Sequence, residues 1–373
     1  MLGKAAGDNQ GCEGQGEVIE VSVRPVPLEF LDAGDEMLQS GFWGRFKQAH
    51  GWTAHPFSVE IAGQAGPAFG MLVLTRRLLH VFTIAYVPFG PVMDTPAGRA
   101  AMLSSLARVL RGFLPRTTLF LRFDLPWKKA GEEPGAGTSR PRIVKSASDM
   151  QPPNTVVVDI APHPEQILAS MKPKTRYNVR LAAKKGVIVE EGGPGDLDRW
   201  YSLYEETSRR DRIAIHSRAY YRGLLRMSGE YPGVRPAVKL LLARHEGELL
   251  AGNIVAFWKK RAAYLYGASS GVKRNLMPTY ALQWDAISRA RQAGCETYDL
   301  FGVPPRPDPD HPMFGLYQFK TGFSDCVLER WGTWDAPFRP VLYALYRAAE
   351  AVRMFYYRSV KKRLRSRARG NDS

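Results

Sequence analysis

The chain has 373 residues, of which 45% are hydrophobic and 24% are charged, and its formal net charge is +16. This composition indicates a globular protein, and the length favours two domains over one. No apolar run reaches the roughly 18 residues that a membrane span needs, and residues 1–16 contain no apolar segment. We therefore expect no membrane helix, no signal peptide and a cytoplasmic protein.

The excess of positive charge predicts a polyanionic partner, for which nucleic acid, a nucleotide-sugar pyrophosphate and anionic lipid are all suitable. Seven cations gather near the C-terminus: Arg358, Lys361, Lys362, Arg363, Arg365, Arg367 and Arg369. We expect the basic tail, residues 361–373, to contact either nucleic acid or an anionic membrane surface. The three cysteines lack metal-ligand spacing, so we expect no metal and no disulfide.

The first half of the chain predicts several strands and an aromatic helix. Residues 18–26 alternate as a strand does, and residues 37–47 form a helical pattern that contains Trp43 and Lys47. Such a helix usually packs its aromatic residues in the core and lets its cations reach the surface. Strand-like runs follow at residues 57–61, 71–74 and 79–87, and a helical pattern runs from Met102 to Leu114.

Asp124 ends the next predicted strand, residues 118–124. In mixed α/β sheets, functional side chains gather at the C-terminal ends of strands, which makes Asp124 a candidate site residue. An aspartate that caps the following loop is an equally good interpretation. Residues 128–146 are rich in Gly, Pro, Lys and Glu and predict a mobile loop over or beside the site.

Residues 171–187 predict a short basic helix, which follows a β-branched strand at residues 155–159. Its cations recur every four residues and share one face: Arg176, Arg180 and Lys184. Thr175 is placed to cap the first turn, and Gly186 is placed to end the last one. A solvated surface helix is the simplest interpretation of such a stripe.

The second half predicts a helix at residues 197–208, strands at residues 237–244 and 252–258, and three further patterned segments. The inward face of the helix carries Trp200, Leu203, Tyr204 and Thr207, and Arg210 lies just after it. The patterned segments are Tyr264-Leu265-Tyr266-Gly267-Ala268-Ser269, Arg274-Asn275-Leu276-Met277-Pro278, and residues 315–323 with their Phe319-Lys320 pair.

These segments resemble signature sequences of the FemABX family of non-ribosomal peptidyltransferases, and they occur in the family's order over residues 37–335. The aromatic helix is similar to L-Q-S-x-x-W-x-x-F-K, and the basic helix is similar to K-T-R-x-N-I-x-x-A-x-K-x-G-V. Residues 264–284 are similar to Y-Y-G-A-S-x-x-x-R-N-L-M-P-x-Y-x-L-Q-W. The last segment is similar to G-L-x-x-F-K-x-x-F-G, except that Ser324 replaces the final glycine.

The resemblance implies a mixed α/β fold of two tandem domains that are similar to GCN5-related N-acetyltransferases (GNAT). We expect a disordered N-terminus at residues 1–16, a first domain at residues 17–160 that is completed by residues 330–360, and a second domain at residues 161–329. No long heptad run lies between Leu197 and Trp284, so the chain resembles the members that lack a coiled-coil arm for tRNA.

The resemblance further implies an aminoacyltransferase that moves an amino acid from aminoacyl-tRNA to the stem-peptide amine of a peptidoglycan precursor, without a cofactor. The acceptor is lipid-linked or UDP-linked, and a lipid-linked acceptor would bring the enzyme to the inner face of the cytoplasmic membrane. The candidate catalytic residues are Lys320, Phe319 and Asp124. The candidate substrate-binding residues are Lys47, Trp43, Arg176, Asn178, Arg180, Arg210, Tyr264, Tyr266, Ser269, Arg274 and Asn275.

The residues are compatible with this chemistry on their own terms. An aminoacyl ester is already activated, so its transfer needs positioning and an oxyanion donor rather than a covalent intermediate, and no Ser-His-Asp or Cys-His set is apparent. A lysine-type amine with a pKa near 10.4 is almost fully protonated at pH 7, so some base must take its proton. Asp124 is the candidate base, and a ribose hydroxyl of the tRNA is the alternative. Lys320, with Phe319 shaping its slot, is the candidate oxyanion donor.

Two other functions fit parts of the sequence. An acyl-CoA N-acyltransferase needs a Q/R-x-x-G-x-G/A loop at a helix N-terminus to bind pyrophosphate. The nearest matches, Arg226-x-x-Gly229-x-Tyr231 and Arg244-x-x-Gly247-x-Leu249, both fail at the last position. A non-catalytic tRNA-binding or envelope scaffold protein would be favoured by a degenerate Phe-Lys motif, and that motif is intact here.

Overall fold

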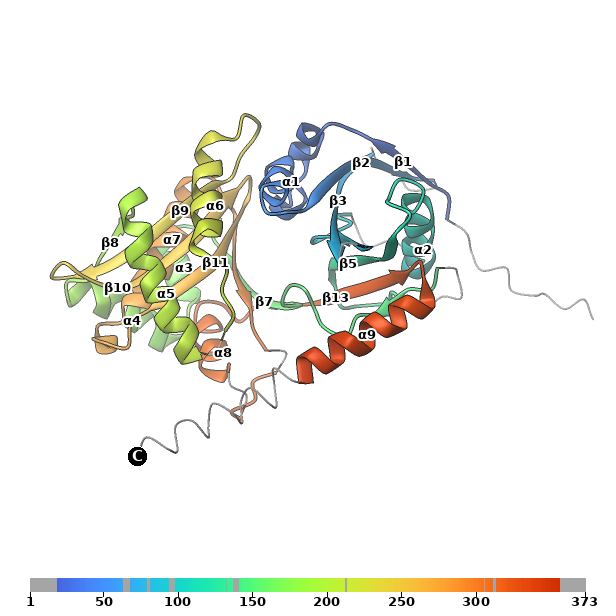
Figure 1. Cartoon of the computed structure of the whole chain (residues 1–373). Coiled ribbons are helices and arrows are strands. Elements are labelled where there is room, and N and C mark those ends of the chain that lie inside the picture. The colour runs from blue at the N-terminus through green and yellow to red at the C-terminus, as the bar shows by residue number, and fades with distance from the viewer. Residues whose placement is uncertain are drawn as a thin grey trace, which may run out of the picture.

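The computed structural model describes residues 19–62, 68–78, 81–93, 98–131, 133–136, 141–211, 213–304, 306–310 and 313–355. The predicted disordered N-terminus and the basic tail lie outside these ranges. Thirteen strands form one mixed sheet that runs through both lobes of the molecule (Figure 1). Their order is β1-β2-β3-β4-β5-β13-β7-β12-β11-β10-β9-β8, and β6 pairs with β13. The expected mixed α/β fold is confirmed.

The first lobe is an antiparallel meander followed by a parallel crossover. Its elements are β1 (Val21–Pro25), the 3-10 helices η1 (Leu28–Ala33) and η2 (Met37–Gln39), α1 (Gly41–Gln48), β2 (Thr53–Ile61), β3 (Phe69–Leu78), β4 (Phe82–Val87), α2 (Arg99–Leu110), β5 (Thr118–Lys128) and β6 (Val144–Lys145). Strands β1 to β4 pair antiparallel, and β5 pairs parallel to β4 after the crossover through α2. α2 buries Met102, Leu106 and Leu110 at helical spacing, as its sequence pattern predicts.

The second lobe repeats this topology. Its elements are β7 (Asn154–Asp159), α3 (Pro164–Ser170), α4 (Pro173–Lys184), β8 (Ile188–Glu191), η3 (Pro194–Asp196), α5 (Leu197–Asp211), α6 (Arg218–Glu230), β9 (Ala237–His245), β10 (Glu248–Trp258), β11 (Arg261–Ser269), η4 (Arg274–Leu276), α7 (Pro278–Gln292), β12 (Thr297–Gly302) and α8 (Phe314–Lys320). Strands β8 to β11 pair antiparallel, and α7 makes the crossover to β12, which is parallel to β11. The two halves are therefore tandem copies of one GNAT-like arrangement.

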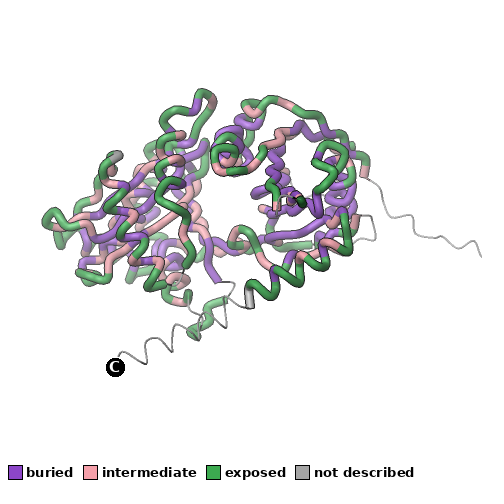
Figure 2. Tube along the Cα trace, viewed as in Figure 1, coloured by how far each residue is buried: buried purple, intermediate pink, exposed green. Residues whose placement is uncertain are grey.

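One hydrophobic cluster joins the lobes. The face of α5 predicted to point inward is buried as expected, at Trp200, Leu203, Tyr204 and Thr207. The same cluster includes Phe42, Trp43 and Phe46 of α1 in the first lobe. In Figure 2 the buried segments run through both lobes, and the exposed segments follow the outer sides of the helices. The helix predicted at residues 37–47 is divided at Ser40, because the Ser40 hydroxyl caps α1 at Trp43 N.

The second connection between the lobes is β13 (Val327–Pro337). Its first residues pair with β7, with Leu328 opposite Thr155, and its later residues pair with β5, with Thr333 opposite Asp124. Since β7 also pairs with β12, its hydrogen bonds place this strand in the second lobe rather than the first. We therefore propose that the domain boundary falls between β6 and β7 instead of after residue 160.

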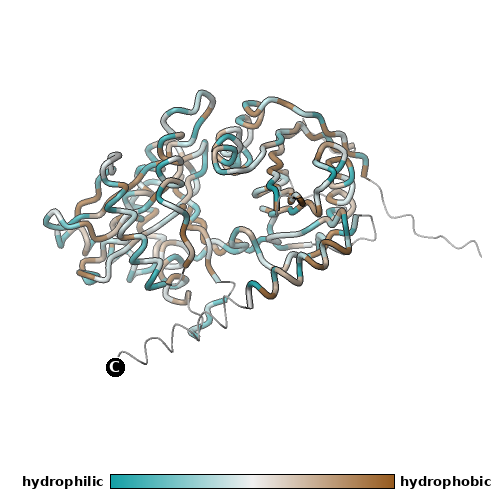
Figure 3. The backbone as a smooth tube through the Cα atoms, in the orientation of Figure 1, coloured by the Kyte–Doolittle hydropathy of each residue, from teal (hydrophilic) through white to brown (hydrophobic). Residues whose placement is uncertain are grey.

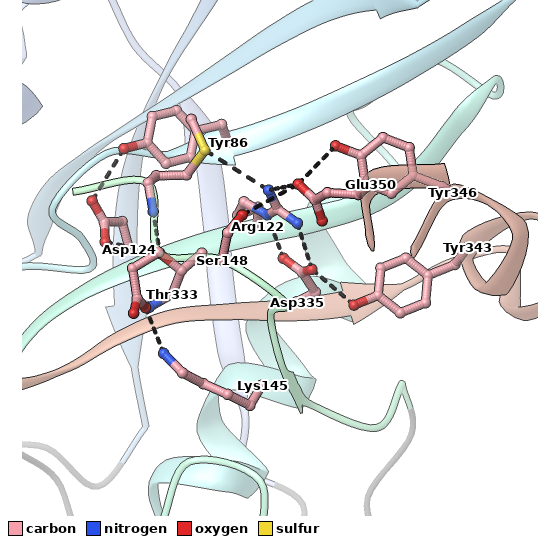
Figure 4. Close-up of polar contacts among 12 residues, drawn as sticks. Tyr86, Arg122, Asp124, Lys145, Ser148, Thr333, Asp335, Tyr343, Tyr346 and Glu350 are labelled. Atoms are coloured by element: carbon pink, nitrogen blue, oxygen red, sulfur yellow. Dashed lines mark hydrogen bonds and ion pairs between the residues drawn. The ribbon is translucent and has the colours of Figure 1, made fainter. Parts of the chain in front are cut away.

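The C-terminal helix α9 (Pro340–Phe355) packs on β5 and completes a buried polar network (Figure 4). Arg122 on β5 donates from Nε and Nη2 to the two carboxylate oxygens of Asp335 on β13, at 2.7 and 2.8 Å. Tyr343 on α9 donates to the same carboxylate at 2.8 Å, and Glu350 lies 3.5 Å from Arg122 Nη1. None of the helices in the described ranges is both long and apolar enough to cross a membrane.

We predict that Asp335→Asn lowers the free energy of unfolding by about 3 kcal/mol, because the buried Arg122 guanidinium loses its two-oxygen carboxylate partner and keeps only the more distant Glu350. The matched control is Glu60→Gln, which removes an ion pair of the same 2.7 Å length between half-exposed side chains. That change should cost less than about 1 kcal/mol. Denaturant titration of both variants measures the difference, and equal losses would contradict the role of burial.

Candidate active site

Lys320, at the C-terminal end of α8, is buried rather than exposed at the surface. Its side chain is only 4% exposed, and Nζ donates to the carbonyl oxygen of Gly302 at 2.9 Å. Nζ also lies 5.6 Å from the centre of the Tyr264 ring. Burial lowers the pKa of Lys320 to about 7, although the carboxylate of Asp299 acts in the opposite direction. Near neutral pH this lysine is therefore present in both its charged and neutral forms.

Aromatic side chains form the wall beside Lys320. The Phe319 ring meets Tyr280 and Phe323 edge-on, with centres 5.0 and 5.3 Å apart. Tyr264, at the other side of Nζ, lies against the backbone of Gly267, where any side chain would collide with its hydroxyl. The family-like segment at residues 264–269 therefore needs its glycine to hold Tyr264 beside the lysine.

The predicted basic helix α4 anchors this motif. Gly322, two residues after Lys320, packs against Thr175 so closely that a side chain there would not fit, and Lys172 N donates to the Gly322 carbonyl at 2.9 Å. The predicted cap is wrong: Pro173 begins the helix and Thr175 is buried within its first turn, because proline suits the first helical position. Gly186 follows the last turn with φ +77°, as predicted.

The members of the basic stripe differ in what they contact. Arg176 donates from Nη1 to the carbonyls of Ala169 and Met171, at 2.9 and 3.0 Å, where it caps the end of α3. Asn178 is buried, and Arg180 is exposed. In the structure Arg176 caps α3, Asn178 is buried, and Arg180 remains open to solvent.

Asp124 lies in the middle of β5, so the prediction that it ends the strand is wrong. The pairing with β13 continues β5 as far as Lys128. The carboxylate is 3% exposed and accepts hydrogen bonds from the Tyr86 hydroxyl at 3.1 Å and from Thr333 Oγ1 at 3.2 Å (Figure 4). Burial raises the pKa of Asp124 to about 7, even though these two hydrogen bonds act to lower it.

The region between β5 and β12 contains residues that the sequence did not single out. Arg330 on β13 donates to Asp299 on β12 at 3.2 Å and lies over the ring of Phe89, 5.1 Å from its centre. Phe89 stacks on Phe301 with ring centres 6.5 Å apart, and both have a left-handed backbone, at φ 43° and 61°. Such conformations are uncommon for bulky residues and often mark functional sites. A cavity of about 50 Å³ borders both rings and the Asp299 carboxylate.

Lys47 forms a second cationic site between the lobes. Its Nζ lies 5.0 Å from the ring centre of Trp43 and 5.6 Å from that of Tyr220 on α6, on which His216 stacks at 4.0 Å. Burial, and to a smaller extent the charge of Arg76, lower the pKa of Lys47 to about 8. The buried Nε1 of Trp43 has no hydrogen-bond partner within the described parts of the chain. Lys47 and Trp43 are thus brought together as predicted, whereas Tyr220 and His216 were missed.

Of the other candidate residues, Arg210, Arg274 and Asn275 are exposed on the second lobe, whereas Tyr266 packs against the hydrophobic cluster that joins the lobes. Arg210 donates to the carbonyl and the hydroxyl of Ser269, at 2.7 and 3.1 Å, so these two candidates meet. Tyr266 contacts Tyr221 edge-on with ring centres 4.9 Å apart. Arg274 and Asn275 are exposed on η4.

The sequence matches the model of the FemAB family over residues 142–231 and 237–351, which together make up more than half of the chain. The lipid II:glycine glycyltransferase of Staphylococcus haemolyticus (strain JCSC1435) is 23% identical, over 83% of this chain and 90% of that protein. The enzyme of the same name from Staphylococcus aureus (strain COL) is 22% identical with the same coverage. The crystal structure of FemX shares the fold, with a TM-score of 0.70, 20% identity, and coverage of 87% of this chain and 100% of that one.

We predict that Lys320→Met stabilises the protein at pH 7. The unfolded chain, with a lysine pKa near 10.4, binds more protons than the folded chain between about pH 7 and 10, so the folded wild type gains stability as pH rises through this window. The advantage of the variant should therefore shrink by up to about 1.4 kcal/mol per pH unit. Denaturant titrations from pH 7 to 10 measure it, with the exposed Lys172→Met as the control. If the free energy of unfolding of Lys320→Met differed from that of the wild type by the same amount at every pH, as expected for Lys172→Met, the effect of burial on Lys320 would be contradicted.

Proposed function

Because the chain belongs to the FemAB family, we propose that it is an aminoacyltransferase that moves an amino acid from aminoacyl-tRNA to the stem-peptide amine of a lipid-linked peptidoglycan precursor. Two relatives that match most of the chain are named lipid II:glycine glycyltransferases, which supports lipid II as the acceptor. The observation that carries the proposal is Lys320, a buried lysine at the end of the family's Phe-Lys motif, whose Nζ has one hydrogen bond to the residues that the structure describes.

Lys320 has the properties of an oxyanion donor. An ammonium group has three N–H donors, and the Gly302 carbonyl accepts one of them, so the others remain for the acyl carbonyl of the substrate. As the amine attacks, negative charge develops on that carbonyl oxygen, and a cation in a dry site stabilises it more than water does. Lys320 is only 4% exposed and its Nζ lies 5.6 Å from the centre of the Tyr264 ring, so little water reaches it.

Asp124 has the properties of a general base. Its pKa of about 7 lets the carboxylate take a proton from the attacking ammonium at neutral pH and release it afterwards. Met150 N donates to Thr333 Oγ1 at 2.8 Å, so the hydroxyl proton of Thr333 is directed to Asp124. Thr333 and Tyr86 therefore hold the carboxylate in a fixed orientation.

Lys47 and the exposed cations suit the anionic parts of the two substrates. We assign Lys47 and Trp43 to the pyrophosphate side of the precursor, since this lysine is mostly charged at neutral pH and lies half-buried between aromatic rings. Arg180, Arg210 and Arg274 are exposed on the second lobe and suit the phosphates of tRNA.

The acyl-CoA alternative receives no support from the geometry. A pyrophosphate loop must precede a helix N-terminus. Residues 226–231 instead form the C-terminal end of α6, and residues 244–249 join β9 to β10 and precede no helix. Arg244, near the end of β9, is paired with Glu190 and Asp196, at 2.5 and 2.7 Å.

We predict that the purified protein adds amino-acid mass to lipid II when it is supplied with a pool of charged tRNA. Lys320→Met should slow this transfer by about 10²–10³-fold, because it removes one oxyanion donor. Lys260→Met, which removes an exposed lysine paired with Glu296, should leave the rate unchanged. Mass spectrometry of the muropeptide measures both. Transfer that requires acyl-CoA in place of charged tRNA would overturn the proposal.

We also predict a bell-shaped dependence of the transfer rate on pH, with its maximum near pH 7. Asp124 must be deprotonated, which produces the acid limb, and Lys320 must be charged, which produces the alkaline limb. Tyr86→Phe removes a hydrogen bond that lowers the pKa of Asp124, so it should move the acid limb to higher pH and leave the alkaline limb in place. An acid limb that persists in Asp124→Asn would reject Asp124 as the base.

A further inference from the structure

The helix α9 has two apolar faces, and only one of them is covered by the protein. Tyr343 and Tyr346 pack against Phe120 on β5, with ring centres 5.3 and 5.0 Å apart. On the opposite side, the exposed fractions are 76% for Val341, 63% for Leu345 and 69% for Val352. These three residues are spaced by four and seven positions, so they form one stripe along the helix.

The outer side of α9 carries no negative charge within the described part of the helix. Its other exposed residues are Pro340, Ala344, Arg347, Ala348, Ala349, Ala351 and Arg353. The acidic residue of the helix, Glu350, is buried and lies beside Arg122. The exposed surface is thus a row of aliphatic side chains flanked by arginines.

This arrangement differs from the other exposed aliphatic residues of the protein. Ile188, Val234 and Val272 are also well exposed, but they lie on β8, on the turn between α6 and β9, and on the turn after β11. Single exposed aliphatic residues are ordinary, whereas an aliphatic row on one helix indicates a binding surface. In Figure 3, apolar segments recur along α9 at the edge of the molecule.

We propose that the outer face of α9 binds the surface of an anionic lipid bilayer. Val341, Leu345 and Val352 would enter the boundary between headgroups and acyl chains, while Arg347 and Arg353 would meet lipid phosphates. A helix with an aliphatic face and flanking cations lies in this position at membrane surfaces. The sequence after α9 adds the seven cations of the basic tail and its approach, which also favour anionic lipid.

Charge distinguishes a bilayer from a second copy of the chain. Two copies joined through α9 would bring the same arginines and the same basic tails close together, and like charges repel. Anionic phospholipids present the opposite charge along the whole surface. The proposal does not depend on the transferred group or its acceptor, and its test requires no transfer reaction. If the enzyme also uses lipid II, the same contact would bring its site to the membrane that holds this acceptor.

The test is co-sedimentation of the full chain with vesicles of phosphatidylglycerol and phosphatidylcholine, compared with vesicles of phosphatidylcholine alone. The variant carries Val341→Gln, Leu345→Gln and Val352→Gln, and the matched control carries Ile188→Gln, Val234→Gln and Val272→Gln. All six residues are exposed, so both proteins should unfold at wild-type denaturant concentrations.

The wild type and the control should bind the anionic vesicles equally. The α9 variant should bind them at least about tenfold more weakly. High salt should weaken the binding of the wild type to anionic vesicles only partly, since the aliphatic contact does not depend on charge. Equal binding of the α9 variant and the wild type would overturn the proposal, as would a wild type that binds no vesicles. A lipid-free dimer that the α9 substitutions convert to monomer, with vesicle binding unchanged, would assign the face to a second copy.

Discussion

The geometry of the candidate active site depends on one strand that forms hydrogen bonds to both lobes. The eleven residues of β13 pair first with β7 and then, with a β-bulge between Arg330 and Gly332, with β5, so the two halves of the molecule share one strand. Arg330 and Thr333 are only three positions apart on this strand, yet one bonds to Asp299 in the second lobe and the other to Asp124 in the first. Backbone hydrogen bonds of this one strand therefore connect the strand of Asp124 to the lobe that contains Lys320.

Burial is the main cause of the shifted pKa values of three candidate residues. Lys320, Lys47 and Asp124 each lose contact with water, and in each case the charged form becomes less favourable. The pKa values of the two lysines fall and the pKa of the aspartate rises, so all three pKa values come close to neutral pH. Lys47 lies beside the cluster of Phe42, Trp200 and their neighbours, whereas Phe319 next to Lys320 packs on the core of the second lobe and Phe123 next to Asp124 belongs to the core of the first.

The sequence predicts what depends on local periodicity and fails where distant residues meet. The buried face of α5 and the crossover helix α2 follow directly from helical spacing, and the Phe-Lys motif identifies Lys320. The burial of Lys320 depends on Gly302 and Tyr264, which no local pattern connects to it. Asp124 was placed at a strand end because its partner strand β13 begins about 200 residues later. Arg122 and Asp335 are 213 positions apart, so their pair has no local signal either.

The late position of β13 in the chain has a consequence for synthesis on the ribosome. All the other paired strands of the first lobe have been translated once β6 is complete, but the strand that covers β5 comes about 190 residues later. At about 5–20 residues per second, this delay lasts roughly 10–40 s. During that time the nascent first lobe has an open sheet edge, and Arg122 has no countercharge. A chain that stops before β13 would keep this edge of β5 exposed, and an unpaired strand edge is a site for pairing with other chains.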